Sequence, residues 1–449
     1  MFFVRYGIVL AVVVLLFGAH ALRAEDALTL NQALRMAYLN NPALNSGRSQ
    51  LLAAHEALPQ ADAGWKPSLT ADASITNTED ATTKVAGLGL AQPVYRGGRT
   101  MAQTGSARHA IAARAEILRT QEQDLFEAAA SSYMDVLRDE ALLSLRQQNR
   151  DIQARQLKAT RDRFEVGELT KTDVSQSEAR LAGAEADMLN AQGNVNSSRA
   201  VFEKIIGTQP INLAVPDSAL VLPASLDEAL QKTEEGSPVI QAAVHLRESS
   251  EKDVDTIFGE LLPEVNLVAG IDRTQDPPTG GGDDTDSTIG IQASMPLYEA
   301  GAVRSRVRQA KHTANSRSLD VMEARRSARE DTVRAWSVLQ AARAQIVSRA
   351  AQVEAASLAR QGVKQEAEIG SRSVLDVLDA DQELLDAQVA LTTARRDEIV
   401  AQFSLLAALG GLTPEVLGFG GEAVDTGKNL AKVRKKIFDM NVDRLEQTE

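Results

Sequence analysis

The chain has no cysteine among its 449 residues, and aromatic residues make up only 4% of it. Disulfide bridges, thiolate chemistry and a lipid anchor on an N-terminal cysteine are therefore excluded. The formal net charge is −13, which argues against nucleic-acid binding because proteins of that class carry basic patches. A Ser-His-Asp arrangement, a P-loop and a dinucleotide-binding fingerprint are also missing. We therefore expect neither an enzyme nor a cofactor.

Long apolar runs are scarce beyond the first residues, MFFVRYGIVLAVVVLLFGAHALRA. Here Arg5 precedes an apolar run from Gly7 to Phe17, and small residues follow. This order is typical of a secretory signal peptide, and the run is too short to span a membrane comfortably. We expect cleavage after Ala21 or Ala24. The loss of two arginines and no acid then changes the net charge from −13 to −13 − 2 = −15.

Proline is absent from residues 94–209 and from residues 297–413, two stretches of nearly equal length. Because proline breaks helix interiors, each stretch predicts a long helical block. In residues 99–165 apolar side chains recur at multiples of seven, which indicates helices that supercoil against neighbours. A returning helix is expected over 172–206, and its counterpart over 373–409. Each block is therefore predicted to be a long antiparallel α-hairpin.

The chain also contains an internal duplication. LNQALRMAYLNNP at 30–42 matches LDEALQKTEEGSP at 226–238, and QPVYRGG at 92–98 matches MPLYEAG at 295–301. Two such repeats form either two similar domains side by side or one pseudo-symmetric body. The matches divide the chain into a signal peptide at 1–24, a first structural repeat at 25–210, a proline-rich connector at 211–224, a second structural repeat at 225–414 and a C-terminal tail at 415–449.

Three segments between the predicted helices alternate between apolar and polar residues: SLTADASI at 68–75, VNLVAGID at 265–272 and IGIQASM at 289–295. Together with turn-rich loops at 77–84 and 274–287, they predict two β-hairpins. The fold class is therefore mainly α with β-hairpins (α+β). Four strands are too few to close a barrel. The hairpins either pack on the helices as an ordinary sheet or join strands of other chains in an outer membrane.

Two longer motifs carry a family resemblance. RDRFEVGELTKTDVSQSEARLA and IGSRSVLDVLDADQELLDAQ resemble the paired hairpin-tip motifs of the TolC-like outer-membrane channels. QPVYRGGRTMAQ resembles the strand-to-helix junction of the same family. The similarity extends from about Leu28 to Pro414 and occurs in both repeats in the same order. The first repeat is most similar to the branch that serves type I secretion.

The resemblance implies a homotrimer in the cell outer membrane. Each chain gives four strands to a 12-stranded transmembrane β-barrel and its long helices to a coiled-coil tube in the periplasm. The implied function is a passive conduit for type I protein secretion or for efflux of small molecules. The implied partners are outer-membrane lipid, a periplasmic adaptor (membrane fusion) protein and an inner-membrane transporter. The alternative is a periplasmic coiled-coil structural or adaptor protein without a pore.

Acidic residues form a stripe in the second tip motif. Asp376, Asp379, Glu383 and Asp386 stand at i, i+3, i+7 and i+10, which places them on one face of a helix. The spacing alone indicates a solvated coiled-coil face. The resemblance implies instead that Asp376 and Asp379 face the bore and form its constriction. A separate apolar stripe that can pack consists of Leu375, Leu378 and Leu385.

The resemblance also implies a gate and a docking surface. Thr172, Asp173 and Arg372 match family positions that tie neighbouring hairpins shut. Ala367 departs from the pattern, since some members carry a tyrosine there. The tips that dock the adaptor are expected at Val166, Gly167, Ile369 and Gly370.

No metal site is expected from the sequence. The histidines at positions 55, 109, 245 and 312 are scattered over the predicted helices, and the acidic stripe contains none of them. Carboxylates alone suit hard cations weakly, and TGGGDDTD at 279–286 lacks the spacing of a calcium loop. The basic segment AKVRKKIF at 431–438 is expected to form a helix on the tube, to be a free end, or to bind an anionic surface.

Overall fold

The computed structural model describes residues 27–79, 82–216, 220–275, 282–420, 426–433, 436 and 439–440. The predicted signal peptide lies outside these residues, and so do parts of the two predicted hairpin loops, the connector and the C-terminal tail. None of the helices described combines the length and hydrophobicity needed to cross a membrane.

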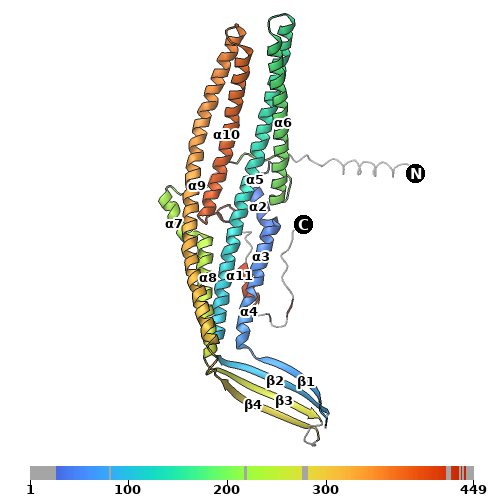
Figure 1. Cartoon of the computed structure of the whole chain (residues 1–449), viewed down its shortest axis with the longest axis vertical. Helices are drawn as coiled ribbons and strands as arrows, with labels where there is room; N and C mark the ends of the chain where they lie inside the picture. The colour runs from blue at the N-terminus through green and yellow to red at the C-terminus, as the bar shows by residue number, and fades with distance from the viewer. Residues whose placement is uncertain are drawn as a thin grey trace, which may run out of the picture. The chain divides into compact units, whose positions relative to one another are not determined.

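The secondary-structure elements follow each other in a similar order twice (Figure 1). The first series consists of α2 (Leu30–Asn40), α3 (Pro42–His55), α4 (Ala57–Asp62), η1 (Ala63–Trp65), β1 (Ser68–Asn77), β2 (Thr82–Arg96), α5 (Arg99–Glu165) and α6 (Lys171–Ile206). The second series consists of α7 (Leu226–Gly236), α8 (Pro238–Phe258), η2 (Gly259–Leu261), β3 (Glu264–Gln275), β4 (Asp284–Ser294), α9 (Ala302–Glu368) and α10 (Val374–Ala408). A short helix, α11 (Thr426–Val433), packs against α3.

The two longest helices, α5 and α9, contain 67 residues each, and α6 and α10 return with 36 and 35 residues. The prediction of a helix over 99–165 is therefore confirmed at both ends. The absence of proline makes such helices possible, because nothing interrupts their backbone hydrogen bonding. The predicted class, mainly α with long antiparallel α-hairpins and four strands, is confirmed.

The chain divides into two compact units, and neither corresponds to one repeat. The first unit combines 1–41, 126–221 and 340–402, and the second combines 42–125, 222–339 and 403–449. Each unit thus takes segments from both repeats. The hairpin turns and the ends of the helices that carry them belong to the first unit, whereas the sheet belongs to the second.

The core of the first unit is organised around the aromatic ring of Tyr133 on α5. The ring is buried against Phe202 of α6, with the ring centroids 6.2 Å apart. Its hydroxyl lies 2.6 Å from the carbonyl oxygens of Leu28 and Ala214 and can donate to either, next to a short parallel bridge between Leu28 and Leu213. Burial raises the pKa of Tyr133 to about 12. The hydroxyl therefore remains a donor and holds Leu28 beside Ala214 of the connector.

The four strands form one antiparallel sheet in the order β1-β2-β3-β4 (Figure 1). The two predicted hairpins pair with each other through β2 and β3, for example at Leu88 and Ile271. Strand β2 begins at Thr82 and β4 at Asp284, inside the loops predicted at 77–84 and 274–287. Both strands extend past their apolar segments because the neighbouring strand continues to supply hydrogen-bonding partners to a polar backbone.

The strand register puts the apolar residues of all three predicted alternating segments on the same face of the sheet. Directly paired residues share a face, and the pairs Leu69–Leu90, Leu88–Ile271 and Ala269–Ile289 connect the apolar residues across the four strands. This face is not covered by the helices, since Leu69, Ile75, Ile289 and Ile291 are 71–79% exposed. The interpretation of the hairpins as an ordinary sheet packed on the helices is therefore wrong for the described chain.

Candidate functional site

Both long hairpins turn at a glycine, as the sequence predicts. Gly167 and Gly370 have φ of +78° and +81°, the left-handed region that favours glycine. The amide N–H of Gly167 donates to the Phe164 carbonyl over 3.0 Å, and that of Glu168 donates to the Arg163 carbonyl over 2.9 Å. These two hydrogen bonds form a Schellman motif, which supplies donors to carbonyls at the end of α5 that would otherwise have no partner in the helix.

The second hairpin repeats this turn. The amide of Gly370 donates to Ala367 over 3.1 Å, and that of Ser371 donates to Glu366 over 2.9 Å. The apolar residue before each glycine points outward, with Val166 72% and Ile369 81% exposed. Each tip therefore presents one uncovered aliphatic side chain on a defined turn.

The two returning helices begin with the same pair of reciprocal hydrogen bonds. In α6, the Asp173 carboxylate accepts a 2.9 Å hydrogen bond from the amide of Thr170. The hydroxyl of Thr170 in turn accepts a 3.3 Å hydrogen bond from the amide of Asp173. In α10, Asp376 and Ser373 form the equivalent pair, at 2.9 Å and 3.2 Å. This is a capping box, which satisfies backbone donors at the start of a helix.

Capping changes the electrostatics of both aspartates. The backbone and side-chain hydrogen bonds from Thr170 hold the pKa of Asp173 below its usual value. The hydroxyl and then the amide of Ser373, helped by the charge of Arg372, hold the pKa of Asp376 below its usual value. Both carboxylates are therefore ionised at neutral pH, and each accepts a hydrogen bond from a backbone amide at the start of its own helix. The acidic stripe thus has a local structural role for Asp376 that its spacing alone did not reveal.

The second acid of the predicted constriction has a different partner. Asp379 on α10 accepts a 2.7 Å hydrogen bond from the guanidinium of Arg180 on α6. This ion pair joins the two α-hairpins near their tips. Arg180 was not among the residues singled out from the sequence, because nothing in its local pattern distinguishes it from the other arginines of the coiled coil.

The predicted gate residues lie close to the turns. Thr172 and Asp173 are in the first turn of α6. Arg372 pairs with Glu366 of its own hairpin at 2.8 Å, and this contact raises the pKa of the arginine. Within one chain, Arg372 is therefore engaged with its own turn, while Arg180 connects the two hairpins.

The apolar stripe beside the acids is only partly buried. Leu378 and Leu385 are buried, whereas Leu375 is 40% exposed. Asp381 lies off the acidic stripe and is buried, and it pairs with Arg360 of α9. A buried acid on the packing side of a helix needs a cationic partner. The position of Asp381 outside the acidic stripe was the signal that could have identified this buried acid from the sequence.

A further contact anchors α10 to α5 away from the tips. Arg396 lies 2.9 Å from Asp135 and 2.7 Å from the hydroxyl of Ser131. Burial by itself lowers the pKa of the Arg396 guanidinium, but Asp135 and Asp397 raise this pKa above its ordinary value. The two hairpins are therefore joined by a partly buried contact at Arg396 and a more exposed one at Arg180.

The polar face of the sheet carries an acidic row. The register places Asp72, Gly87, Asp272 and Asp286 side by side on the four strands. The carboxylate of Asp272 occupies the space where Gly87 would carry a Cβ. Glycine at this position therefore makes room for an acid on the neighbouring strand.

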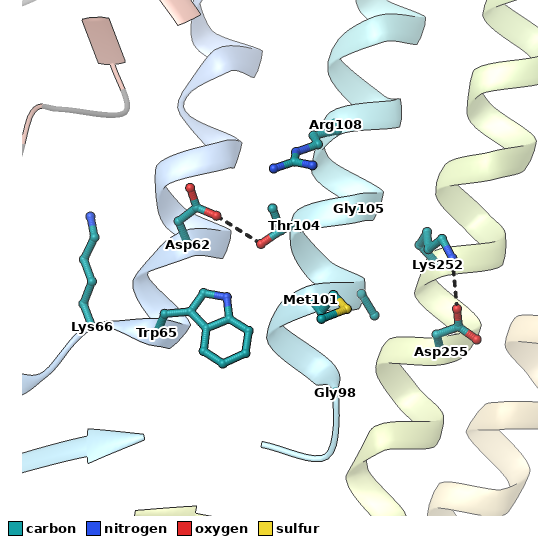
Figure 2. A pocket seen from close by; sticks show the side chains of 11 residues that line it. Asp62, Trp65, Lys66, Gly98, Met101, Thr104, Gly105, Arg108, Lys252 and Asp255 are labelled. Carbon is teal, nitrogen blue, oxygen red and sulfur yellow. Dashed lines mark hydrogen bonds and ion pairs between the residues drawn. The ribbon is translucent and has the colours of Figure 1, made fainter. Parts of the chain in front are cut away.

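A pocket of about 750 Å³ lies in the second unit at the start of α5 (Figure 2). Figure 2 shows Trp65 of η1 beside Met101 and Thr104 of α5, with Asp62 bonded to the Thr104 hydroxyl at 3.2 Å. Lys252 of α8 lies 3.4 Å from Asp255 on the far side. The lining combines an exposed indole and thioether with scattered charges, without convergent donors for a cofactor.

The histidines are not all scattered, contrary to the sequence-based interpretation. His109 of α5 and His245 of α8 stand with their ring centroids 6.1 Å apart. Both Nδ1 atoms approach the same carboxylate oxygen of Glu248. By contrast, His55 is buried and His312 is exposed elsewhere. Residues 136 positions apart in sequence meet here because α5 and α8 pack together.

The comparisons with known proteins agree with this geometry. Residues 33–208 and 229–411 match the family described as outer membrane efflux protein. The chain is 32% identical over 438 residues to the outer membrane efflux protein BepC of Brucella suis, covering 96% of each chain. It is 27% identical to the outer membrane protein TolC of Vibrio cholerae, covering 88% of this chain and 92% of the other.

A solved structure shows the same fold. The outer membrane protein VceC from Vibrio cholerae superposes with a TM-score of 0.73 at 20% sequence identity, over 85% of this chain and 96% of that one. The family match covers both repeats and nearly all the elements that build the hairpins and the sheet. The chain therefore belongs to the outer membrane efflux protein family, whose TolC-like fold forms outer-membrane channels for efflux and secretion.

Proposed function

We propose that three copies of this chain form one passive conduit, in which four strands per chain close a common barrel and the long hairpins form a periplasmic tube. The observation that carries this proposal is the exposed apolar face of the sheet. Such a face suits lipid, and its opposite face carries mostly small and polar residues, as a water-filled lumen requires. In the described chain, β1 and β4 each pair on one side only, so further strands are needed to complete them.

The long helices support the assembly as well. Several large apolar side chains of α9 are exposed in the single chain. They are Leu319, Met322, Val333, Val338, Val347 and Leu358. Leu319 and Met322 are three positions apart on one face of α9, and we propose that another protein surface covers them. We assign this contact to the neighbouring copies, because a closed tube brings helices of adjacent chains side by side.

The hairpin tips are the proposed docking points for a periplasmic adaptor and, with it, an inner-membrane transporter. Val166 and Ile369 present aliphatic side chains on nearly identical turns. Three chains would therefore offer six similar tips. The cargo, small molecules or a secreted protein, would pass from the transporter through the tube to the exterior.

The acids near the tips are the proposed constriction. Three copies would bring six carboxylates, from Asp376 and Asp379, to the periplasmic mouth of the tube. Arg180 would hold the hairpins of one chain together through Asp379 in the closed state. Thr172, Asp173 and Arg372 would add contacts between neighbouring chains.

The test compares adjacent residues on the two faces of β4. Ile289 lies on the apolar face and Thr288 on the polar face, as their pairing with Ala269 and Gly270 shows. A lysine facing lipid costs about 2–4 kcal/mol at the midplane, so Ile289→Lys should prevent stable insertion. Thr288→Lys should still give trimers in outer-membrane fractions and conductance in planar bilayers.

The contrary results are equally specific. A monodisperse, soluble monomer of the unaltered chain would support the coiled-coil protein without a pore. Normal insertion of Ile289→Lys would show that the apolar face does not meet lipid.

A further inference from the structure

The contact between α5 and α8 brings three metal-binding side chains together. The Nδ1 atom of His109 lies 3.0 Å from Glu248 Oε2, and the Nδ1 atom of His245 lies 3.1 Å from the same oxygen. One donor atom from each of the three residues falls within 4.8 Å of the others. We propose that His109, His245 and Glu248 form a binding site for a divalent transition-metal ion. This inference is independent of the proposed conduit.

The separations suit coordination. An ion about 2.0–2.1 Å from nitrogen and oxygen ligands needs donor atoms roughly 3.0–3.4 Å apart in a tetrahedral or more compressed arrangement. Both nitrogen–oxygen distances already lie at this lower limit. The donor atoms of the two imidazoles lie within 4.8 Å of each other, so an entering ion requires the three side chains to adjust their positions around it.

The backbone arrangement is held independently of the three ligands. Ser106, three residues before His109 on α5, lies 3.0 Å from the Ser249 hydroxyl and 2.7 Å from Asp253 on α8. His245 and Glu248 are three residues apart on α8, so they lie on one face of that helix. The site thus spans two helices whose spacing is set by a neighbouring hydrogen-bond cluster.

The chemistry of the donors selects the ion. Imidazole nitrogen suits Zn²⁺, Ni²⁺, Co²⁺ and Cu²⁺, whereas Mg²⁺ and Ca²⁺ prefer oxygen ligands. The three side chains are 30–34% exposed, which leaves room for water as a further ligand. The guanidinium of Arg247 lies 3.8 Å from the other oxygen of Glu248, while Oε2 is directed to the imidazoles.

Among the residues that the structure describes, the site occurs once, although the chain is duplicated. His312 on α9 corresponds to His109, but the first-repeat positions that correspond to His245 and Glu248 are Ser49 and Leu52. A bound ion would therefore tie α5 of the first repeat to α8 of the second. It would stabilise the folded chain by mass action, because the unfolded chain lacks the assembled site.

The experiment uses the full chain in detergent, with any histidine tag removed and bound metal stripped by a chelator. Zn²⁺ is titrated by calorimetry, and Co²⁺ is followed by its visible absorption. We expect one ion per chain, with Zn²⁺ displacing Co²⁺. Binding should weaken on acidification, because metal binding to imidazole nitrogen competes with protons.

Three conservative variants test the ligands: His109→Asn, His245→Asn and Glu248→Gln. Each should weaken Zn²⁺ binding more than about tenfold, since even outer-shell partners of a metal contribute that much. His312→Asn is the matched control and should bind Zn²⁺ like the unaltered chain. Zn²⁺ should also raise the thermal unfolding midpoint of the unaltered chain and of His312→Asn, with no such rise for the ligand variants.

The opposite outcomes would overturn the proposal. If His109→Asn and Glu248→Gln both retain full affinity, the three residues are an ion-pair cluster that fastens α5 to α8. If His312→Asn loses as much affinity as His109→Asn, the ion binds elsewhere.

Discussion

The guanidinium of Arg180 on α6 lies 2.7 Å from the carboxylate of Asp379 on α10. This pair connects hairpins from different repeats, close to the turns that lead into both helices. Its side chains are 41% and 58% exposed, so it contributes only about 0.2–1 kcal/mol, a factor of at most about five in an equilibrium. A contact of that strength suits the gate that we propose, because it can be broken at a small free-energy cost.

Reversing one charge of this pair should shift the channel toward its open state. Arg180→Glu places two acids together, and we expect a larger open fraction in single-channel recordings, by up to about fivefold for each of the three pairs of the trimer. The double variant Arg180→Glu with Asp379→Arg should restore the original fraction. The control is Arg161→Glu, whose partner Glu178 lies at 2.6 Å within the same hairpin. Equal effects of both reversals would contradict a specific tie between the hairpins.

The capping boxes predict local fraying of the returning helices. Asp376→Ala removes the acceptor for the Ser373 amide and should speed hydrogen exchange in the first turn of α10, by roughly threefold to tenfold. Asp173→Ala should do the same in α6 and leave α10 unchanged. If neither turn exchanges faster, the caps contribute nothing to the order of the tips.

The same caps predict a pH dependence. The pKa values of Asp173 and Asp376 lie below their usual value in the folded chain. Their contribution is therefore present above about pH 4, the ordinary aspartate range, and is lost as the pH falls through the lowered values. Protection from hydrogen exchange in both first turns, measured against the intrinsic amide rate at each pH, should decrease on acidification below about pH 4. Asp376→Ala should remove this decrease in α10 alone.

Cation preference provides a test of the constriction. Asp379→Asn keeps the size of the side chain and removes its charge, so three copies lose three carboxylates and also the ion pairs with Arg180. We expect a lower cation preference in planar bilayers and weaker block by trivalent cations. Asp376→Asn should add to this effect, but it also weakens the cap of α10, which the sequence alone did not anticipate. Asp272→Asn, in the acidic row of the sheet, is the comparison: a larger change there would locate the selectivity in the barrel.

The turn glycines provide a test of docking. Gly167→Trp should leave trimers and membrane insertion intact but abolish export, because the indole covers the tip and the left-handed backbone resists a side chain. Gly207→Trp is the matched control. Gly207 also has a positive φ, +91°, and open space around it, but it ends α6 far from the tip. Normal export by Gly167→Trp would exclude the tip from the docking surface.

Local patterns in the sequence were sufficient for the helices, the turns and most of the strands. Two proline-free stretches specified α5 and α9, and Gly167 and Gly370 marked where each helix reverses. The alternation in β1, β3 and β4 also specified which side chains share a face. These features depend on backbone conformation and on residues a few positions apart. They can therefore be predicted without knowledge of the tertiary contacts.

Only the tertiary structure decided which distant side chains meet. Arg180 and Asp379 are 199 residues apart, and His109 and Glu248 belong to different repeats. The pairing of β2 with β3 likewise joined two hairpins that the sequence predicted separately. Contacts of this kind depend on how helices and strands pack, because a periodic pattern specifies the face of an element but not the residue opposite it. The sequence therefore determined the elements and the family resemblance, while the packing determined the ion pair between the hairpins and the histidine cluster.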